Sequence, residues 1–176
     1  MSSFDFENVI DLNSERALKI GFFLWIWHAD KVPPHIGCSI NGVYFSLKVN
    51  GKDDKKDSCK ALFVIQQKKI ATVLVKVKTQ INLENVQSIF NGYEKAGRNG
   101  QTCISPITEI LGCSDSVFQL TTLLRFLETR QQIESVFGLN LTKDYRGIPA
   151  YTKIDIDNRL RTLEDVKIQK YIPTIR

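Results

Sequence analysis

The chain of 176 residues is poor in the residue types that build metal centres and disulfide frameworks. It contains four cysteines and only two histidines. The cysteines stand at 38, 59, 103 and 113 and form no C-x-x-C pair, so we expect neither a zinc ribbon nor a dithiol redox site. His28 and His35, taken with Cys38 or Asp30, match no standard zinc spacing. The sequence therefore predicts no metal site and no cofactor.

Long apolar runs and targeting signals are also lacking. The longest apolar run, IGFFLWIW at 20–27, is far too short to span a bilayer. Residues 1–19 are polar and acidic without a basic n-region, which argues against a signal peptide and a membrane anchor. We therefore expect a cytoplasmic protein with reduced thiols. The length fits a single domain over 1–176, and no internal repeat is visible.

The charge of the chain is moderate and dispersed. The formal net charge is +5, and the lysines are spread along the sequence. The densest charge run, GKDDKKD at 51–57, alternates in sign and is typical of a solvated loop. Nucleic acid is therefore not an expected partner.

The hydrophobic pattern predicts an α+β fold with a central antiparallel sheet flanked by helices. Strands are expected at 19–27, 35–40, 43–49, 61–65, 70–77 and 148–156. Helices are expected at 8–18, 82–96, 103–111, 115–137 and 163–171, with Ser114 as a cap of the fourth.

The clearest local signal is a hairpin centred on Asn41-Gly42. A type I′ turn needs positive φ at both central positions, which Asn and Gly adopt most easily, and it pairs Ile40 with Val43. Alternation along the strands then separates two faces. The apolar face carries Ile36, Cys38, Ile40, Val43, Phe45, Leu47 and Val49, and the opposite face carries His35, Gly37, Ser39, Tyr44, Ser46 and Lys48. We therefore expect Cys38 in the core and His35 on a polar face beside open space at Gly37.

Cys103 is the cysteine that the pattern places at the start of a helix. The helix dipole lowers the pKa of a thiol there, and the thiolate is the reactive form. Two registers are open. Thr102 can be the N-cap with Cys103 first in the helix, or Ser105 can be the N-cap with Pro106 first and Cys103 in the preceding loop. A buried structural thiol is the common alternative for a free cysteine.

The order of these segments resembles that of a known superfamily. HIGCSINGVYFSL followed by TCISPITEIL resembles the circularly permuted papain-like hydrolases, namely the YiiX-like branch of the NlpC/P60 superfamily and the relatives of lecithin retinol acyltransferase. The likeness covers about 18–112, whereas 113–176 has no counterpart. It implies a permuted papain-like core in which Cys103 is the nucleophile and His35 the base. It also implies a third residue that orients His35, for which Ser46 and Lys48 are the candidates on the same face.

Two functions follow from these observations. In the first, a cysteine peptidase, amidase or acyltransferase attacks an amide or ester carbonyl through Cys103, and His35 protonates the leaving group. Backbone N–H groups near Cys103 would then hold the oxyanion. A peptide or protein is the expected substrate. In the second, the chain is a non-catalytic binding or scaffold domain with an incidental Cys/His pair, in which Tyr44 and Lys48 line a ligand groove. The oligomeric state is not indicated.

Overall fold

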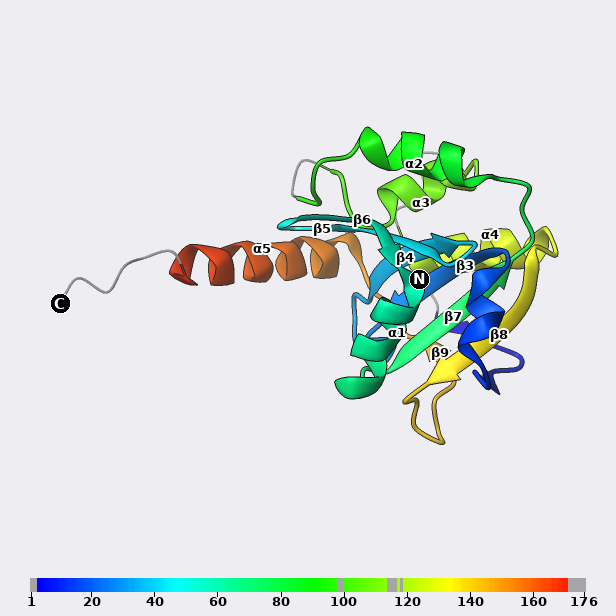
Figure 1. The fold of residues 1–176 in the computed structure, drawn as a ribbon. Coiled ribbons are helices and arrows are strands. Elements are labelled where there is room, and N and C mark those ends of the chain that lie inside the picture. Colours follow the sequence, from blue (N-terminus) through cyan, green and yellow to red (C-terminus); the bar gives the residue numbers. More distant parts are fainter. Residues whose placement is uncertain (1–2, 98–99, 114–116, 118, 171–176) are drawn as a thin grey trace.

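The computed structural model describes residues 3–97, 100–113, 117 and 119–170, and a seven-stranded sheet organises them (Figure 1). The strand order is β2-β8-β7-β3-β4-β5-β6. The strands are β2 (Ile10–Asp11), β3 (Phe22–Trp27), β4 (His35–Ile40), β5 (Val43–Lys48), β6 (Gly51–Asp57), β7 (Thr72–Val77) and β8 (Ile133–Leu139). A separate pair joins β1 (Phe4–Asp5) to β9 (Gly147–Ile148). Every pair in the large sheet is antiparallel except β2 with β8, so the expected antiparallel sheet is in fact mixed at one edge.

Helices cover both faces of this sheet and confirm the α+β class. They are η1 (Glu15–Lys19, a 3₁₀ helix), α1 (Ser58–Gln67), α2 (Leu83–Asn91), α3 (Ser105–Ile110), α4 (Leu120–Thr129) and α5 (Lys153–Lys170). Side chains of η1 and α1 form a smaller core on one face, and side chains of α2, α3 and α4 form the larger core on the other. The long helix α5 runs outward from the body of the molecule (Figure 1).

The hairpin between β4 and β5 is confirmed in turn and register. Asn41 and Gly42 both have positive φ, of 49° and 83°, and Ile40 pairs with Val43. The face of Tyr44, however, is not a polar surface, because α1 covers it. Tyr44 packs in the smaller core, and Ser39 is buried and accepts a hydrogen bond of 2.8 Å from Trp25 Nε1. The prediction that Tyr44 lines a ligand groove is therefore wrong.

Two adjoining segments between β5 and β7 have a different secondary structure from the one expected. The charged run 51–57, expected as a loop, is the edge strand β6. Charged side chains are common on edge strands because they discourage further strand pairing. The apolar run 61–65, expected as a strand, lies in α1, which Asp57 caps by accepting a hydrogen bond from Cys59 N. Leu62 and Ile65, three residues apart, face the smaller core, which is the spacing of a helix rather than a strand.

The terminal segments differ most from expectation. The helix expected at 8–18 is β2 followed by η1, the helix expected at 115–137 is α4 followed by β8, and the strand expected at 148–156 is β9 followed by the start of α5. Gln131 has φ of 54°, which ends the helical path after α4 and turns the chain into β8 against β7. The expected cap at Ser114 lies outside the described residues. The helix at 82–96 begins after Asn82 as expected but ends at Asn91.

Gly37 lies where β4 passes the Tyr44 ring, so the expected open space is filled. A Cβ on Gly37 would lie 2.5 Å from Tyr44 Oη and 2.8 Å from Phe45 O. We expect Gly37→Ala to lower the free energy of unfolding by about 1–3 kcal/mol, because the buried phenol would have to move. Urea unfolding measures this change. Gly92→Ala is the matched control, since Gly92 has φ of −71° and is expected to stay within about 1 kcal/mol of the wild type. Equal effects of the two substitutions would contradict the packing explanation.

Candidate functional site

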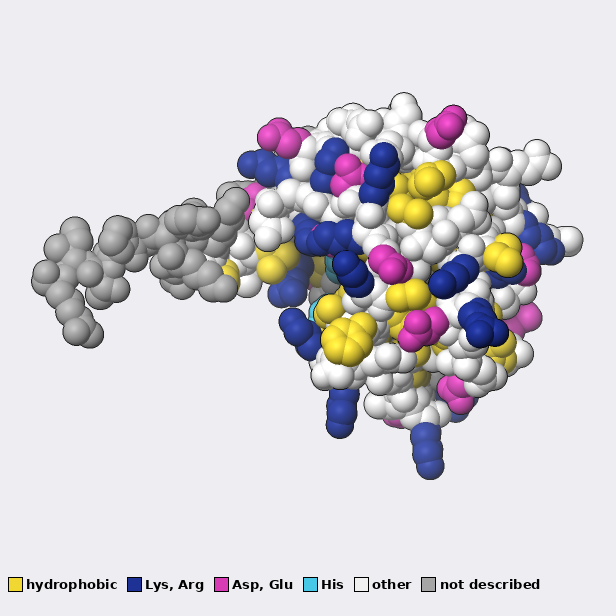
Figure 2. Space-filling view, in the orientation of Figure 1, with side chains coloured by type: hydrophobic (Ala, Val, Ile, Leu, Met, Phe, Trp, Pro, Cys, Tyr) yellow, Lys and Arg dark blue, Asp and Glu magenta, His cyan; other side chains and the backbone are white. Residues whose placement is uncertain are grey.

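A pocket of about 860 Å³ opens where three central strands begin or end. Trp27 is the last residue of β3, His35 the first of β4 and Lys48 the last of β5, and all three line the pocket. One stripe of α5 forms a further wall: Ile156, Arg159, Leu160, Leu163 and Val166. Figure 2 shows the histidine side chains, in cyan, recessed beside the start of α5 and surrounded by lysine and arginine.

Cys103 reaches this pocket from the turn that precedes α3. Ala96 N donates to Lys48 O (2.9 Å), which ties the connection after α2 to the end of β5. The turn itself is closed by Thr102 N donating to Ser105 Oγ (2.9 Å) and by Ser105 N donating to Thr102 O (3.1 Å). The helix begins at Ser105, so Cys103 lies in the loop, as in the second of the two expected registers, although Ser105 is in the helix rather than its cap.

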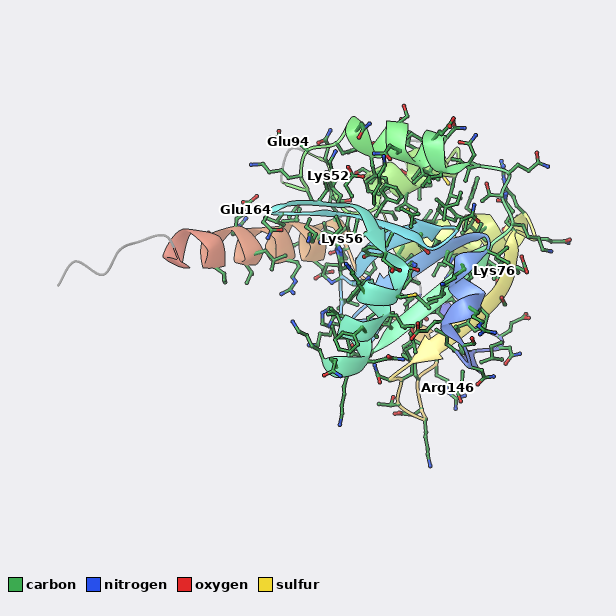
Figure 3. The ribbon with its side chains drawn as sticks, in the orientation of Figure 1. Lys52, Lys56, Lys76, Glu94, Arg146 and Glu164 are labelled. Carbon is green, nitrogen blue, oxygen red and sulfur yellow. The ribbon has the colours of Figure 1, made fainter. Side chains whose placement is uncertain are left out.

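Lys52 joins the end of α2, where this connection begins, to the edge of the sheet. Its Nζ, on the edge strand β6, donates to Phe90 O (2.8 Å) and Tyr93 O (3.0 Å) at the end of α2 (Figure 3). A cation at the C-terminal carbonyls of a helix is favourable because it faces the negative end of the dipole. The contact holds α2 and the segment leading to Cys103 against the sheet.

The structure brings Cys103 and His35 to the same pocket but not into a hydrogen bond. Both side chains line the cavity. Ile36 belongs to the larger core, against which Cys103 packs, so strand alternation directs the neighbouring His35 toward the opposite face. Among the described residues, no hydrogen bond joins the thiol to the imidazole. The two groups therefore share the cavity at the start of β4 without a direct bond between them.

Burial shapes the protonation of both groups. It raises the pKa of the Cys103 thiol, and nearby backbone N–H groups of Ile36, Cys103 and Ile104 oppose this rise without reversing it. The prediction of a lowered Cys103 pKa is therefore wrong, because burial outweighs the effect of the nearby backbone N–H dipoles. Burial, and after it the charge of Lys48, lower the pKa of His35 to about 4, and the Lys48 effect is as expected for a lysine beside an imidazole. The resting pair is a neutral thiol and a neutral imidazole.

The expected orienting residues are engaged with another group, Asp53. Ser46 Oγ donates to Asp53 Oδ2 (2.9 Å), Lys48 Nζ donates to Asp53 Oδ1 (2.8 Å), and Lys56 also contacts this carboxylate. Ser46 therefore does not hold the His35 ring. Asp53 escaped the sequence interpretation because its segment was expected to be a loop, although alternation along β6 pairs it with Ser46.

The other cysteines occupy different environments from Cys103. Cys38 is fully buried in the larger core, as expected. Cys59 lies in the first turn of α1, so Cys103 is not the one cysteine near a helix start. Burial and the neighbouring Asp57 carboxylate raise the Cys59 pKa. Burial likewise raises the pKa of Cys113. None of these three side chains lines the described pocket.

Several pocket residues were missed from the sequence. Lys31 lies in the loop between β3 and β4, and Arg159 lies on α5. The sequence does indicate α5, because its apolar and pocket residues at 156, 159, 160 and 163 follow helical spacing. The helix start is missed because a strand is expected at 148–156, which overlaps it.

Comparison with known protein families, with curated proteins and with solved structures finds no match to this chain. Among the described residues, no three His, Cys, Asp or Glu side chains come together as a metal site. Within the same part of the chain, no helix has both the length and the apolar character needed to cross a membrane. A function for this chain is therefore proposed from the geometry of the pocket.

The low pKa of His35 predicts a pH-dependent stability. The folded pKa of about 4 lies below the ordinary value of 6.5, so the unfolded chain binds a proton between these values and the folded chain does not. Stability from this group is fully present above pH 6.5 and is lost as the pH falls toward 4, by about 3 kcal/mol. Urea unfolding at a series of pH values measures the loss. His35→Gln should remove this part of the pH dependence, and an unchanged profile would contradict the burial of a neutral imidazole.

Proposed function

We propose that this protein is a thiol hydrolase that cleaves an amide or ester bond, with Cys103 as nucleophile and His35 as base. The observation that supports this function is that Cys103 and His35, far apart in sequence, line one pocket. The Ile36 amide next to His35 in the chain also lies against the thiol. A permuted papain-like arrangement would have this relation between strand histidine and helix-start cysteine.

The reaction would run through a thioester. His35 takes the proton from Cys103 Sγ as the sulfur attacks the carbonyl carbon and the carbon–sulfur bond forms. The bond to the leaving nitrogen or oxygen then breaks, and that atom receives the proton from His35. A water molecule, deprotonated by His35, attacks the thioester and releases the acid, and the proton returns to Cys103 Sγ.

The surroundings of Cys103 suit the charge that develops in this reaction. The backbone N–H groups of Cys103 and Ile104 face the reacting centre and can stabilise an oxyanion there. His35 is neutral in the resting protein and so can accept a proton. Hydrogen bonds between catalytic groups are often long without substrate and tighten in the complex, which accommodates the lack of a direct bond between Cys103 and His35.

A second candidate is the non-catalytic binding domain. The engagement of Ser46 and Lys48 with Asp53 favours it, because neither of these two side chains then orients the His35 ring. In that case the pocket binds a ligand and Cys103 does not react. The two candidates differ in whether acyl transfer to Cys103 depends on His35.

Acylation by 4-nitrophenyl acetate tests the proposed function. We expect release of 4-nitrophenol with a thioester on Cys103, located by mass spectrometry of peptides. Cys103→Ala should abolish this modification, and His35→Gln should slow it at least 100-fold, because general base catalysis contributes about 10²–10⁴. Cys59→Ser is the matched control and should leave the rate unchanged. Acylation that is as fast without His35, or that occurs mainly at Cys59 or Cys113, would favour the binding domain.

A further inference from the structure

The charged side chains that line the pocket are all cationic. They are Lys31, Lys48 and Arg159, and among the described residues no Asp or Glu lines the cavity. The chain as a whole has a more even balance of charges, with 24 Lys and Arg against 19 Asp and Glu. Lys48 is paired with Asp53. Lys31 and Arg159 form no ion pair in the part of the chain that the structure describes.

Lys31 and Arg159 come from different elements, and both line the pocket together with His28. Both charges lower the pKa of His28, after burial, which is the larger cause. Asp30 acts on His28 in the opposite direction; like Lys31 and Arg159 it is exposed, but it does not line the pocket. Two cations therefore line the cavity, and within the described residues no acidic side chain lines it beside them.

The mouth of the pocket beside these cations is apolar. Val32, Leu163 and Val166 line it and are 46%, 39% and 48% exposed. Deeper in the cavity, Leu47 and Ile104 continue the apolar lining toward Cys103. The pocket volume of about 860 Å³ lies within the range of small-molecule sites, about 300–1,000 Å³. A ligand that complements both the cations and the apolar lining has one negative group and an apolar segment.

We propose that the pocket selects a carboxylate-bearing substrate, with the carboxylate held between Lys31 and Arg159 and an apolar segment directed toward Cys103. The cleavage of this substrate rests on the proposed hydrolase function, whereas its binding does not. Arg159 can bind a carboxylate through two parallel N–H groups, and Lys31 adds a point charge. Lys31 and Arg159 are exposed and solvated in the free protein, and a carboxylate is the ligand group whose charge complements both of them.

Two esters that differ in one terminal group test the selection. Mono-4-nitrophenyl adipate and 4-nitrophenyl hexanoate have acyl chains of the same length, and only the adipate carries a carboxylate. We expect kcat/KM for the adipate to be at least 10-fold higher at low salt. The ratio of the two values should fall toward one in Lys31→Gln and Arg159→Gln. Lys60→Gln removes an exposed charge in the first turn of α1, beside the β4–β5 turn and at the opposite end of these strands from His35 and Lys48, and should leave the ratio unchanged. A ratio near one in the wild type would overturn the proposal.

Binding without chemistry separates this proposal from the proposed function. In Cys103→Ala, or Cys103→Ser if the alanine variant does not fold, adipic acid monoamide should raise the pKa of His28 measured by NMR. The raised pKa would follow from the offset of the Lys31 and Arg159 charges, and hexanamide should have no such effect. Binding of the monoamide without acylation of the wild-type protein would support the carboxylate site and contradict the hydrolase. Acylation without preference for the adipate, and without a shift at His28, would support the hydrolase and contradict the carboxylate site.

A peptide carboxylate can come from an acidic side chain or from a free C-terminus. Acetyl-Leu-Glu-Ala-amide and acetyl-Leu-Gln-Ala with a free C-terminus present one each, and acetyl-Leu-Gln-Ala-amide presents neither. Tighter binding of either charged peptide to Cys103→Ala supports the site and identifies the source. Equally tight binding of the neutral peptide would overturn the selection by charge.

Discussion

The burial of β3 on both faces is the constraint on which the architecture depends. Its first five residues are buried, with Phe22, Leu24 and Ile26 in the larger core and Phe23 and Trp25 in the smaller one. Each large apolar side chain of this kind contributes about 1.5–3 kcal/mol when it is removed from water. Both faces of the sheet must therefore be covered by helices. The space that remains for a ligand lies at the strand ends, where the pocket opens and where α5 supplies the missing wall.

Asp53 is the polar counterpart of this constraint at the edge of the sheet. Burial of its carboxyl group opposes ionisation, but hydrogen bonds from Lys48, Lys56 and Ser46 outweigh that effect and lower its pKa. The carboxylate thereby joins the end of β5 to β6 and fixes the position of the Lys48 charge. Because Lys48 lowers the pKa of His35 and Asp53 raises it, this ion pair also sets part of the electrostatic environment of the imidazole.

The features that could be predicted from the sequence are those with local causes. The Asn41-Gly42 turn follows from backbone preferences at two residues, and its register determines that Cys38 is buried. The state of 61–65 depends instead on the cap at Asp57 and on a core across the sheet, so an apolar run alone did not distinguish helix from strand. The pairing of Cys103 with His35 is an expectation from a resemblance in segment order, and the structure shows only that both line one pocket. The roles of Asp53, Lys31 and Arg159 depend on contacts between distant segments, which periodicity does not reveal.

The cations around the pocket connect the state of the histidines with the charge of the proposed ligand. Nearby positive charges help to lower the pKa of both His28 and His35, after burial, and so favour the neutral form of each ring. A neutral imidazole can accept a proton, but one with so low a pKa is a weak base. A carboxylate bound beside Lys31 and Arg159 would offset the charges that act on His28, whereas the low pKa of His35 follows from burial and from Lys48. The Cys103 thiol, protonated at rest because of its raised pKa, is less reactive toward oxidants than a thiolate would be. In the proposed enzyme, burial would therefore keep both the nucleophile and the base uncharged in the absence of substrate.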